Sequence, residues 1–96
     1  MELFIFARFH ARPGCEAAVE AALREVLAPT RGEPGCLGIH LFRSVRDARL
    51  FHVHSRWRDE AAFDIHGEQP HTLRFVERVE PLIEHALDIT RSAMIG

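Results

Sequence analysis

The chain has 96 residues, which suits one domain, residues 1–96, and leaves no room for a second independent core. Its 12 basic and 14 acidic residues give a formal charge of −2, which excludes the basic surface that nucleic-acid binding requires. No apolar run approaches the ~18 residues of a membrane span, and no secretion leader is recognisable, so we expect no membrane contact. Two cysteines, Cys15 and Cys36, are too few for a disulfide framework and favour a reducing, cytoplasmic compartment.

The chain lacks several residue types that common reactions need. All of its basic residues are arginines, and it contains no lysine, tyrosine or asparagine. Schiff-base lysines, phosphate-loop lysines and asparagine oxyanion donors are therefore excluded. Seven histidines and the acidic residues remain for proton transfer, and only histidine titrates near neutral pH without perturbation.

The first third of the chain predicts a strand followed by a helix. Residues 3–12 are rich in phenylalanine and apolar, which is typical of a strand, and Pro13-Gly14 ends it. Residues 16–27 predict a helix, because apolar side chains recur on one stripe among strong helix formers. Pro29 and Gly32 are expected to end this helix.

The middle of the chain predicts a hairpin and a second helical region. Residues 36–45 and 49–57 read as two strands joined by a tight turn near residues 46–48. Asp59 is expected to cap a helix that runs to about Gly67. Pro70 interrupts it, and helical spacing resumes from Thr72 to about Glu80.

Residues 87–94 alternate and predict a closing strand, so the order of elements is β-α-β-β-α-β. With right-handed crossovers this order gives an α+β, ferredoxin-like fold: an antiparallel four-stranded sheet in the order 4-1-3-2 with helices on one face. Phe4 and Phe6 alternate with Leu3 and Ile5, so the first strand is apolar on both sides. A second copy of the chain that covers the open face, forming a homodimer, would remove this apolar surface from water.

Two segments carry a family resemblance. They are Glu33-Pro34-Gly35-Cys36-Leu37-Gly38 and the run Ser55-Arg56-Trp57-Arg58-Asp59-Glu60-Ala61-Ala62-Phe63, followed by His66 and Pro70-His71. The chain resembles the antibiotic biosynthesis monooxygenase (ABM) domain family over nearly its full length. The resemblance implies a dimeric α/β barrel with one pocket per subunit between sheet and helices. Members include cofactor-free monooxygenases acting on quinols and aromatic polyketides, whereas relatives degrade haem, isomerise sugars or lactones, or have no known activity.

The resemblance also implies two site residues. Trp57 occupies the place of a pocket tryptophan, and His66 the place of a pocket histidine. Several oxygen-using relatives pair that tryptophan with an asparagine, which this chain lacks; Val53 is one place where it would be expected. Haem degradation and the polyketide chemistry of those relatives are therefore less favoured.

We interpret His66 as a general base for a phenolic hydroxyl and Trp57 as a flat surface for an aromatic substrate. The alternative for His66 is a histidine that interacts only with carbonyls at a helix end. This interpretation requires a hollow for a planar molecule between the two rings. The residues expected to bind substrate or line the pocket are Phe51, Val53, Phe63, Phe75 and Arg74.

Three other histidines form the alternative site, a metal centre. His52 and His54 share one strand face, and His40 falls opposite His54 across the hairpin. Three imidazoles satisfy the ligand count of a catalytic metal. The same alternation points them away from the pocket and toward the expected dimer contact, where histidines commonly bond each other or water.

The sequence thus favours a monooxygenase that uses dioxygen on a small aromatic substrate, a quinol, polyphenol or polyketide, with no cofactor or metal. Two alternatives stay open. One is a non-catalytic dimeric module that binds a small ligand. The other is an isomerase or lactone-processing enzyme in which His66 shuttles a proton.

Overall fold

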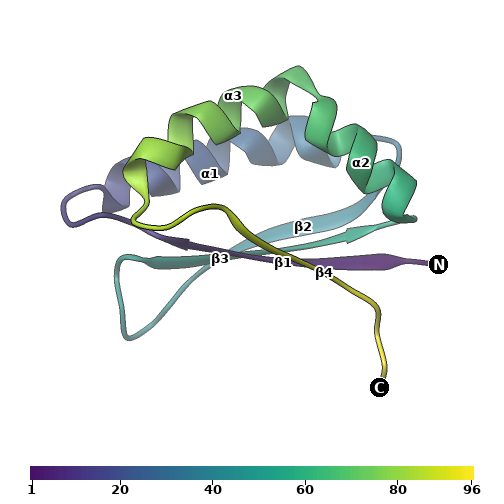
Figure 1. Cartoon of the computed structure of the whole chain (residues 1–96), viewed down its shortest axis with the longest axis horizontal. Helices are drawn as coiled ribbons and strands as arrows, with labels where there is room; N and C mark the ends of the chain where they lie inside the picture. The colour runs from purple at the N-terminus through teal and green to yellow at the C-terminus, as the bar shows by residue number, and fades with distance from the viewer.

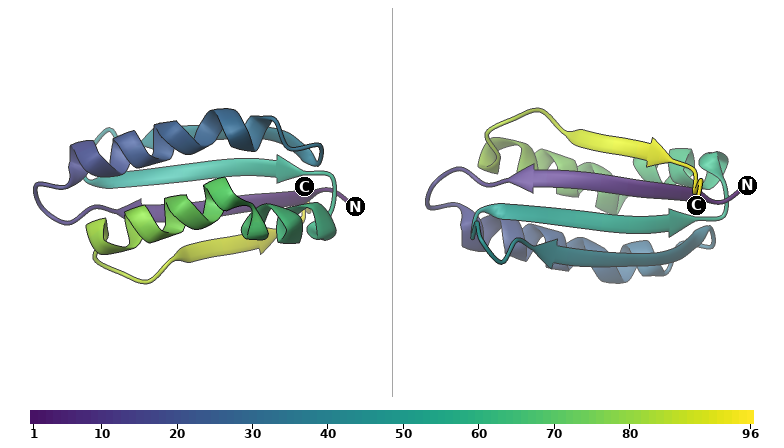
Figure 2. Two further views of the ribbon diagram at one scale, coloured as in Figure 1. Left: turned by 90° about the horizontal axis from the view of Figure 1, so that it is seen from above. Right: turned by 90° about the horizontal axis from the view of Figure 1, so that it is seen from below.

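A four-stranded antiparallel sheet carries the fold. The computed structural model, which describes residues 1–96, contains strands β1 (Leu3–His10), β2 (Cys36–Arg43), β3 (Leu50–Trp57) and β4 (Asp88–Ser92). Their order across the sheet is β2-β3-β1-β4, and every neighbouring pair is antiparallel (Figure 2). This arrangement confirms the ferredoxin-like topology predicted from the alternation of strands and helices.

The helices lie together on one face of this sheet. They are α1 (Glu16–Arg31), α2 (Glu60–Glu68) and α3 (Pro70–Val79), with a short 3-10 turn, η1 (Glu80–Leu82), after α3. Figure 1 shows all of them above the sheet, and the right-hand view of Figure 2 shows the opposite face uncovered. No helix is both long enough and apolar enough to cross a membrane.

The first helix is one turn longer than predicted, because Pro29 lies inside it. A proline removes only its own N–H, here the donor to the carbonyl of Glu25, and the next turn still forms. The backbone N–H of Gly32 donates to the carbonyl of Ala28 at 3.2 Å and closes the helix, as expected for Gly32. Thr30, which is completely buried, anchors the extra turn against the core.

Strand boundaries are shorter than predicted where pairing partners run out. β1 ends at His10 rather than at residue 12, and β2 ends at Arg43 rather than at residue 45. β4 spans only the residues that pair with β1, from Asp88 opposite Arg8 to Ser92 opposite Phe4. A strand extends only as far as a neighbouring strand pairs with it, so apolar alternation alone extends it too far.

Alternation along the strands divides the core from the open face. Odd-numbered residues of β1 and β3 point toward the helices and are buried. The larger core cluster lies under α1 and α3, where Phe9 meets Phe75 edge to face at 5.7 Å between ring centroids. A separate, smaller cluster contains Trp57 and Ala62 and lies under α2. The candidate site belongs to this second cluster.

The Asp59 cap predicted from the sequence is present. The Asp59 carboxylate accepts a hydrogen bond from the N–H of Ala62 at 2.8 Å, and this bond lowers the pKa of Asp59. A carboxyl whose pKa is lower in the folded chain stabilises the fold above its unfolded pKa, ordinarily 3.8, and loses that effect as pH falls through the folded value.

We therefore expect Asp59→Ala to lower the melting temperature by a few degrees at neutral pH, because the start of α2 loses its cap. The gap between variant and wild type should narrow below about pH 4, where the wild-type carboxyl is protonated. Thermal unfolding followed by circular dichroism across this pH range measures both effects. Asp59→Asn, which keeps a capping oxygen, is the matched control; an alanine variant as stable as wild type at neutral pH would contradict the role of the cap.

Candidate active site

Trp57 and His66 meet, as their sequence positions predicted. Trp57 ends β3 with 1% of its surface exposed, and its indole N–H donates to the hydroxyl of Ser55 at 2.9 Å. The His66 ring, carried by α2, packs against the indole with 4.7 Å between ring centroids. Phe63 contacts both rings, at 5.6 Å from Trp57 and 5.5 Å from His66.

The predicted hollow between the two rings is therefore absent. Ring centroids 4.7 Å apart leave no space for a planar molecule, and Phe63 fills the adjoining side. The sequence placed both aromatic groups at one end of the fold, but interior side chains pack until such gaps close. Any ligand must approach His66 from another direction.

A largely buried carboxylate, Glu33, contacts both His66 and His71. Glu33 lies in the connection between α1 and β2, and its Oε2 accepts hydrogen bonds from two imidazoles. The donors are Nδ1 of His66 at 2.6 Å and Nε2 of His71, on α3, at 2.8 Å. The side chains are 9%, 14% and 16% exposed for Glu33, His66 and His71, so water screens this cluster weakly.

The hydrogen bond to Glu33 determines which nitrogen of His66 is free. A carboxylate only accepts hydrogen bonds, so Nδ1 of His66 carries a proton, and in the neutral imidazole Nε2 carries the lone pair. Nε2 makes no hydrogen bond within the chain, and the only buried side-chain polar atom that lacks a partner is the Thr30 hydroxyl. Nε2 is therefore open to solvent and oriented by Glu33, the arrangement in which carboxylates hold catalytic histidines.

Backbone contacts hold Glu33 in this position. The first residue of β2, Cys36, pairs with Trp57, and the N–H of Cys36 donates to the carbonyl of Glu33 at 3.0 Å. Gly35 lies against α2: a Cβ atom built on Gly35 would stand 2.4 Å from the Cβ of Ala62. Only glycine allows the turn to approach the helix so closely, and this approach brings the carboxylate within reach of His66.

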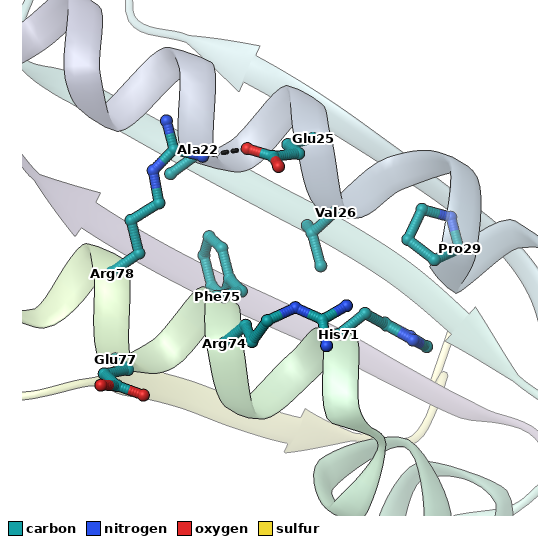
Figure 3. Close-up of a pocket in the computed structure, with 9 residues that line it drawn as sticks. All are labelled: Ala22, Glu25, Val26, Pro29, His71, Arg74, Phe75, Glu77 and Arg78. Atoms are coloured by element: carbon teal, nitrogen blue, oxygen red, sulfur yellow. Dashed lines mark hydrogen bonds and ion pairs between the residues drawn. The ribbon is translucent and has the colours of Figure 1, made fainter.

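Two surface cavities adjoin the cluster, and His71 lines both. The first, of about 580 Å³, lies between α1 and α3, with Arg74 and Phe75 beside His71 (Figure 3). The second, of about 370 Å³, is lined by Glu33 and by residues of α2. Glu33 and His71 therefore border these cavities, whereas His66 lines neither of them.

The residues expected to bind substrate separate into groups. Arg74 and Phe75 share the larger cavity with His71, and Phe63 belongs to the aromatic cluster, with the Arg91 guanidinium 4.9 Å above its ring. Phe51 lines a third cavity of about 400 Å³ against α1, and Val53 is a core residue that is 9% exposed.

The three histidines of the alternative metal site lie on the open face of the sheet. His40 and His54 are partners across the hairpin, as expected. However, Nδ1 of His54 bonds to the carbonyl of Ile5 at 3.0 Å, and its ring stacks on Phe6 at 4.6 Å. The histidine and acidic groups whose ligand atoms converge, all within 4.8 Å of one another, are Glu33, His66 and His71.

Sequence reasoning missed Glu33 as a site residue. It used Glu33 and His71 only as parts of the segments that carry the family resemblance. A usable signal existed: the turn leads into β2, which pairs with β3 at Trp57, so its one carboxylate had to lie near the start of α2.

Burial raises the pKa of the Cys36 thiol in the same turn, which keeps it protonated at neutral pH and excludes a reactive thiolate.

Comparisons with known proteins identify the family of the chain. Residues 3–78 match the family described as "Antibiotic biosynthesis monooxygenase". The chain is 33% identical over 86 residues to "Putative monooxygenase Rv0793" of Mycobacterium tuberculosis, covering 90% of this chain and 84% of that one. It is 32% identical over 65 residues to "Putative monooxygenase YcnE" of Bacillus subtilis, covering 68% of each.

Solved structures show the same fold. The structure of Rv0793 gives a TM-score of 0.94 at 29% identity and covers 100% of this chain and 97% of that chain. The crystal structure of PA3566 from Pseudomonas aeruginosa gives a TM-score of 0.91 at 35% identity, covering 99% of this chain and 95% of that chain.

We expect Gly35→Ala to lower the free energy of unfolding by about 1–3 kcal/mol, because the added methyl overpacks the contact with Ala62. Urea unfolding followed by the fluorescence of Trp57, the only tryptophan, measures this loss. Gly67→Ala is the matched control: nothing lies within 4 Å of its Cβ position, and alanine favours the helix by up to about 1 kcal/mol. If both variants were equally stable, the close approach would not matter.

Proposed function

Because the chain belongs to the antibiotic biosynthesis monooxygenase family, we propose that it oxidises a quinol, a polyphenol or an aromatic polyketide-like compound with dioxygen and without a bound cofactor. The observation that carries the proposal is the free Nε2 of His66, held in place by Glu33 and backed by Trp57. An oriented imidazole with an open nitrogen is suited to remove the proton of a phenolic hydroxyl.

The proposed reaction starts with proton transfer from the hydroxyl of the substrate to Nε2 of His66. The resulting anion transfers one electron to dioxygen, and the two radicals combine at a ring carbon that bears hydrogen. The peroxide formed loses water, which leaves a carbonyl at that carbon. One oxygen atom enters the quinone and the other leaves as water, so the substrate supplies all the electrons.

The direct packing of Trp57 on His66 suggests distinct roles for the two. We propose that Trp57 is a positioning residue that supports the imidazole from behind, since its indole is buried and cannot face a ligand. The substrate would reach Nε2 from the ring edge away from Glu33, because Nδ1 is the nitrogen that faces Glu33 and His66 lines neither of the cavities beside His71. The contact with Trp57 keeps water away from that face of the His66 ring.

We also propose that the protein is a homodimer formed through the open face of the sheet. Phe6 on β1 and Phe42 on β2 are each 53% exposed there, although both are large apolar side chains on strands. A second copy placed sheet to sheet would bury them, as the resemblance implies. The proposed site lies on the helix side and stays open in such a dimer.

A non-catalytic ligand-binding module is the second candidate, and one observation favours it. The space between Trp57 and His66 is filled by the chain's own side chains, as expected if the fold no longer turns over a planar substrate. This candidate predicts binding of small aromatic compounds without consumption of oxygen.

We expect His66→Ala to reduce oxygen uptake with the best substrate of a hydroquinone panel by at least about 100-fold, the usual contribution of a general base. An oxygen electrode measures the rate, and chromatography identifies the product. His85→Ala is the matched control, because His85 lies in the connection to β4, outside the proposed site. An equal rate in the His66 variant would exclude it as the base. No uptake by wild type with any substrate would favour the module, and substrate conversion without oxygen would favour an isomerase.

We expect Phe6→Glu to convert the dimer to a monomer, because two charges would face each other in the buried contact. Light scattering coupled to gel filtration should show half the wild-type mass. Leu73→Glu is the control: Leu73 is similarly exposed, at 56%, but lies on α3 in the helix layer. A monomeric wild-type protein would contradict the proposed dimer.

A further inference from the structure

The cluster of Glu33, His66 and His71 has the composition and geometry of a metal site. One carboxylate oxygen and two imidazole nitrogens lie within 4.8 Å of one another, contributed by the α1–β2 turn, α2 and α3. We propose that these three side chains bind a divalent first-row transition-metal ion, with zinc as the best match. This proposal concerns binding and does not rest on the proposed oxidation.

The donor set selects the class of ion. Two histidines and one carboxylate form a common three-ligand set for zinc and for other first-row divalent ions. Magnesium and calcium require mostly oxygen ligands, and the cluster offers only one carboxylate. No cysteine is among the groups whose ligand atoms converge here.

Metal binding requires the three ligand atoms to rearrange. In a tetrahedral site with bonds of about 2.0–2.1 Å, neighbouring ligand atoms stand about 3.3 Å apart. The Glu33 oxygen is now hydrogen-bonded to the two nitrogens at 2.6 and 2.8 Å, so these gaps must open by about 0.7 and 0.5 Å, and the two nitrogens, within 4.8 Å of each other, must come to the same separation. His66 and His71 sit on separate helices joined through the single residue Gln69, whose extended backbone allows such a shift.

The surroundings also suit an ion. The three side chains are largely buried, which strengthens their attraction for a cation. Glu33 and His71 line the cavity of about 370 Å³, which provides an entry path and room for water as a fourth ligand. Arg58 lines the same cavity, but its guanidinium interacts with the Asp59 carboxylate.

Metal binding and base catalysis would exclude each other. An ion on Nδ1 of His66 forces the ring proton onto Nε2, which then has no lone pair to accept a proton. The metal-bound chain would therefore lack the base on which the proposed oxidation depends. The metal-free form would retain it.

Calorimetric titration of the chelator-treated, dialysed wild-type protein with zinc chloride tests the proposal. We expect one zinc ion per chain and at least a 100-fold loss of affinity in both Glu33→Gln and His71→Ala, because each removes a ligand. Circular dichroism of both variants establishes that they are folded. Titration with cobalt(II) should give the visible absorption bands of a site with low coordination number.

His52→Ala, on the open face of the sheet, is the matched control and should bind zinc within twofold of wild type. Absence of zinc binding by the folded wild-type protein would overturn the proposal. So would unchanged affinity in the folded Glu33 and His71 variants, or loss of binding in the His52 variant, which would assign the ion to His40, His52 and His54. The titration needs no turnover, so a failed oxidation assay leaves its result intact.

Discussion

One carboxylate oxygen joins three parts of the chain. Oε2 of Glu33 accepts hydrogen bonds from His66 on α2 and from His71 on α3, while the backbone carbonyl of Glu33 accepts one from Cys36 at the start of β2. A carboxylate that is only 9% exposed is costly to bury unless it is bonded, and the two imidazoles supply those bonds. These hydrogen bonds also hold two histidines near the break between α2 and α3, where no side chain caps the start of α3.

The same hydrogen bonds to Glu33 determine the chemistry available at the site. They leave Nε2 of His66 free on the ring edge away from Glu33, place Glu33 and His71 beside the cavities, and leave one face of the His66 ring to Trp57. Base catalysis uses the nitrogen that Glu33 does not hold, whereas metal binding uses the one that it does. The His66 ring can therefore serve either role, and the choice between them depends on which of its two nitrogens carries the proton.

The two faces of the sheet have separate tasks. Side chains toward the helices build the core and the Trp57 cluster, while Phe6, Phe42 and the three histidines of the hairpin occupy the uncovered face. Because side chains alternate along β1 and β3, the assignment of one residue fixes the others on the same strand. A surface for a second copy and a reactive pocket can therefore coexist in one thin domain.

The sequence by itself determined the elements and their order, because periodicity, proline, glycine and the Asp59 cap act locally, and its family resemblance implied that Trp57 and His66 share one site. It overextended β1 and misplaced the end of α1, since strand pairing and the burial of Thr30 are non-local. Only the tertiary structure brought Glu33 into contact with His66 and His71, which lie 33 and 38 residues further along the chain. It also closed the slot that was expected beside Trp57. Both outcomes depend on how closely the turn at Gly35 packs against Ala62, and close packing is a property of the folded chain rather than of any segment.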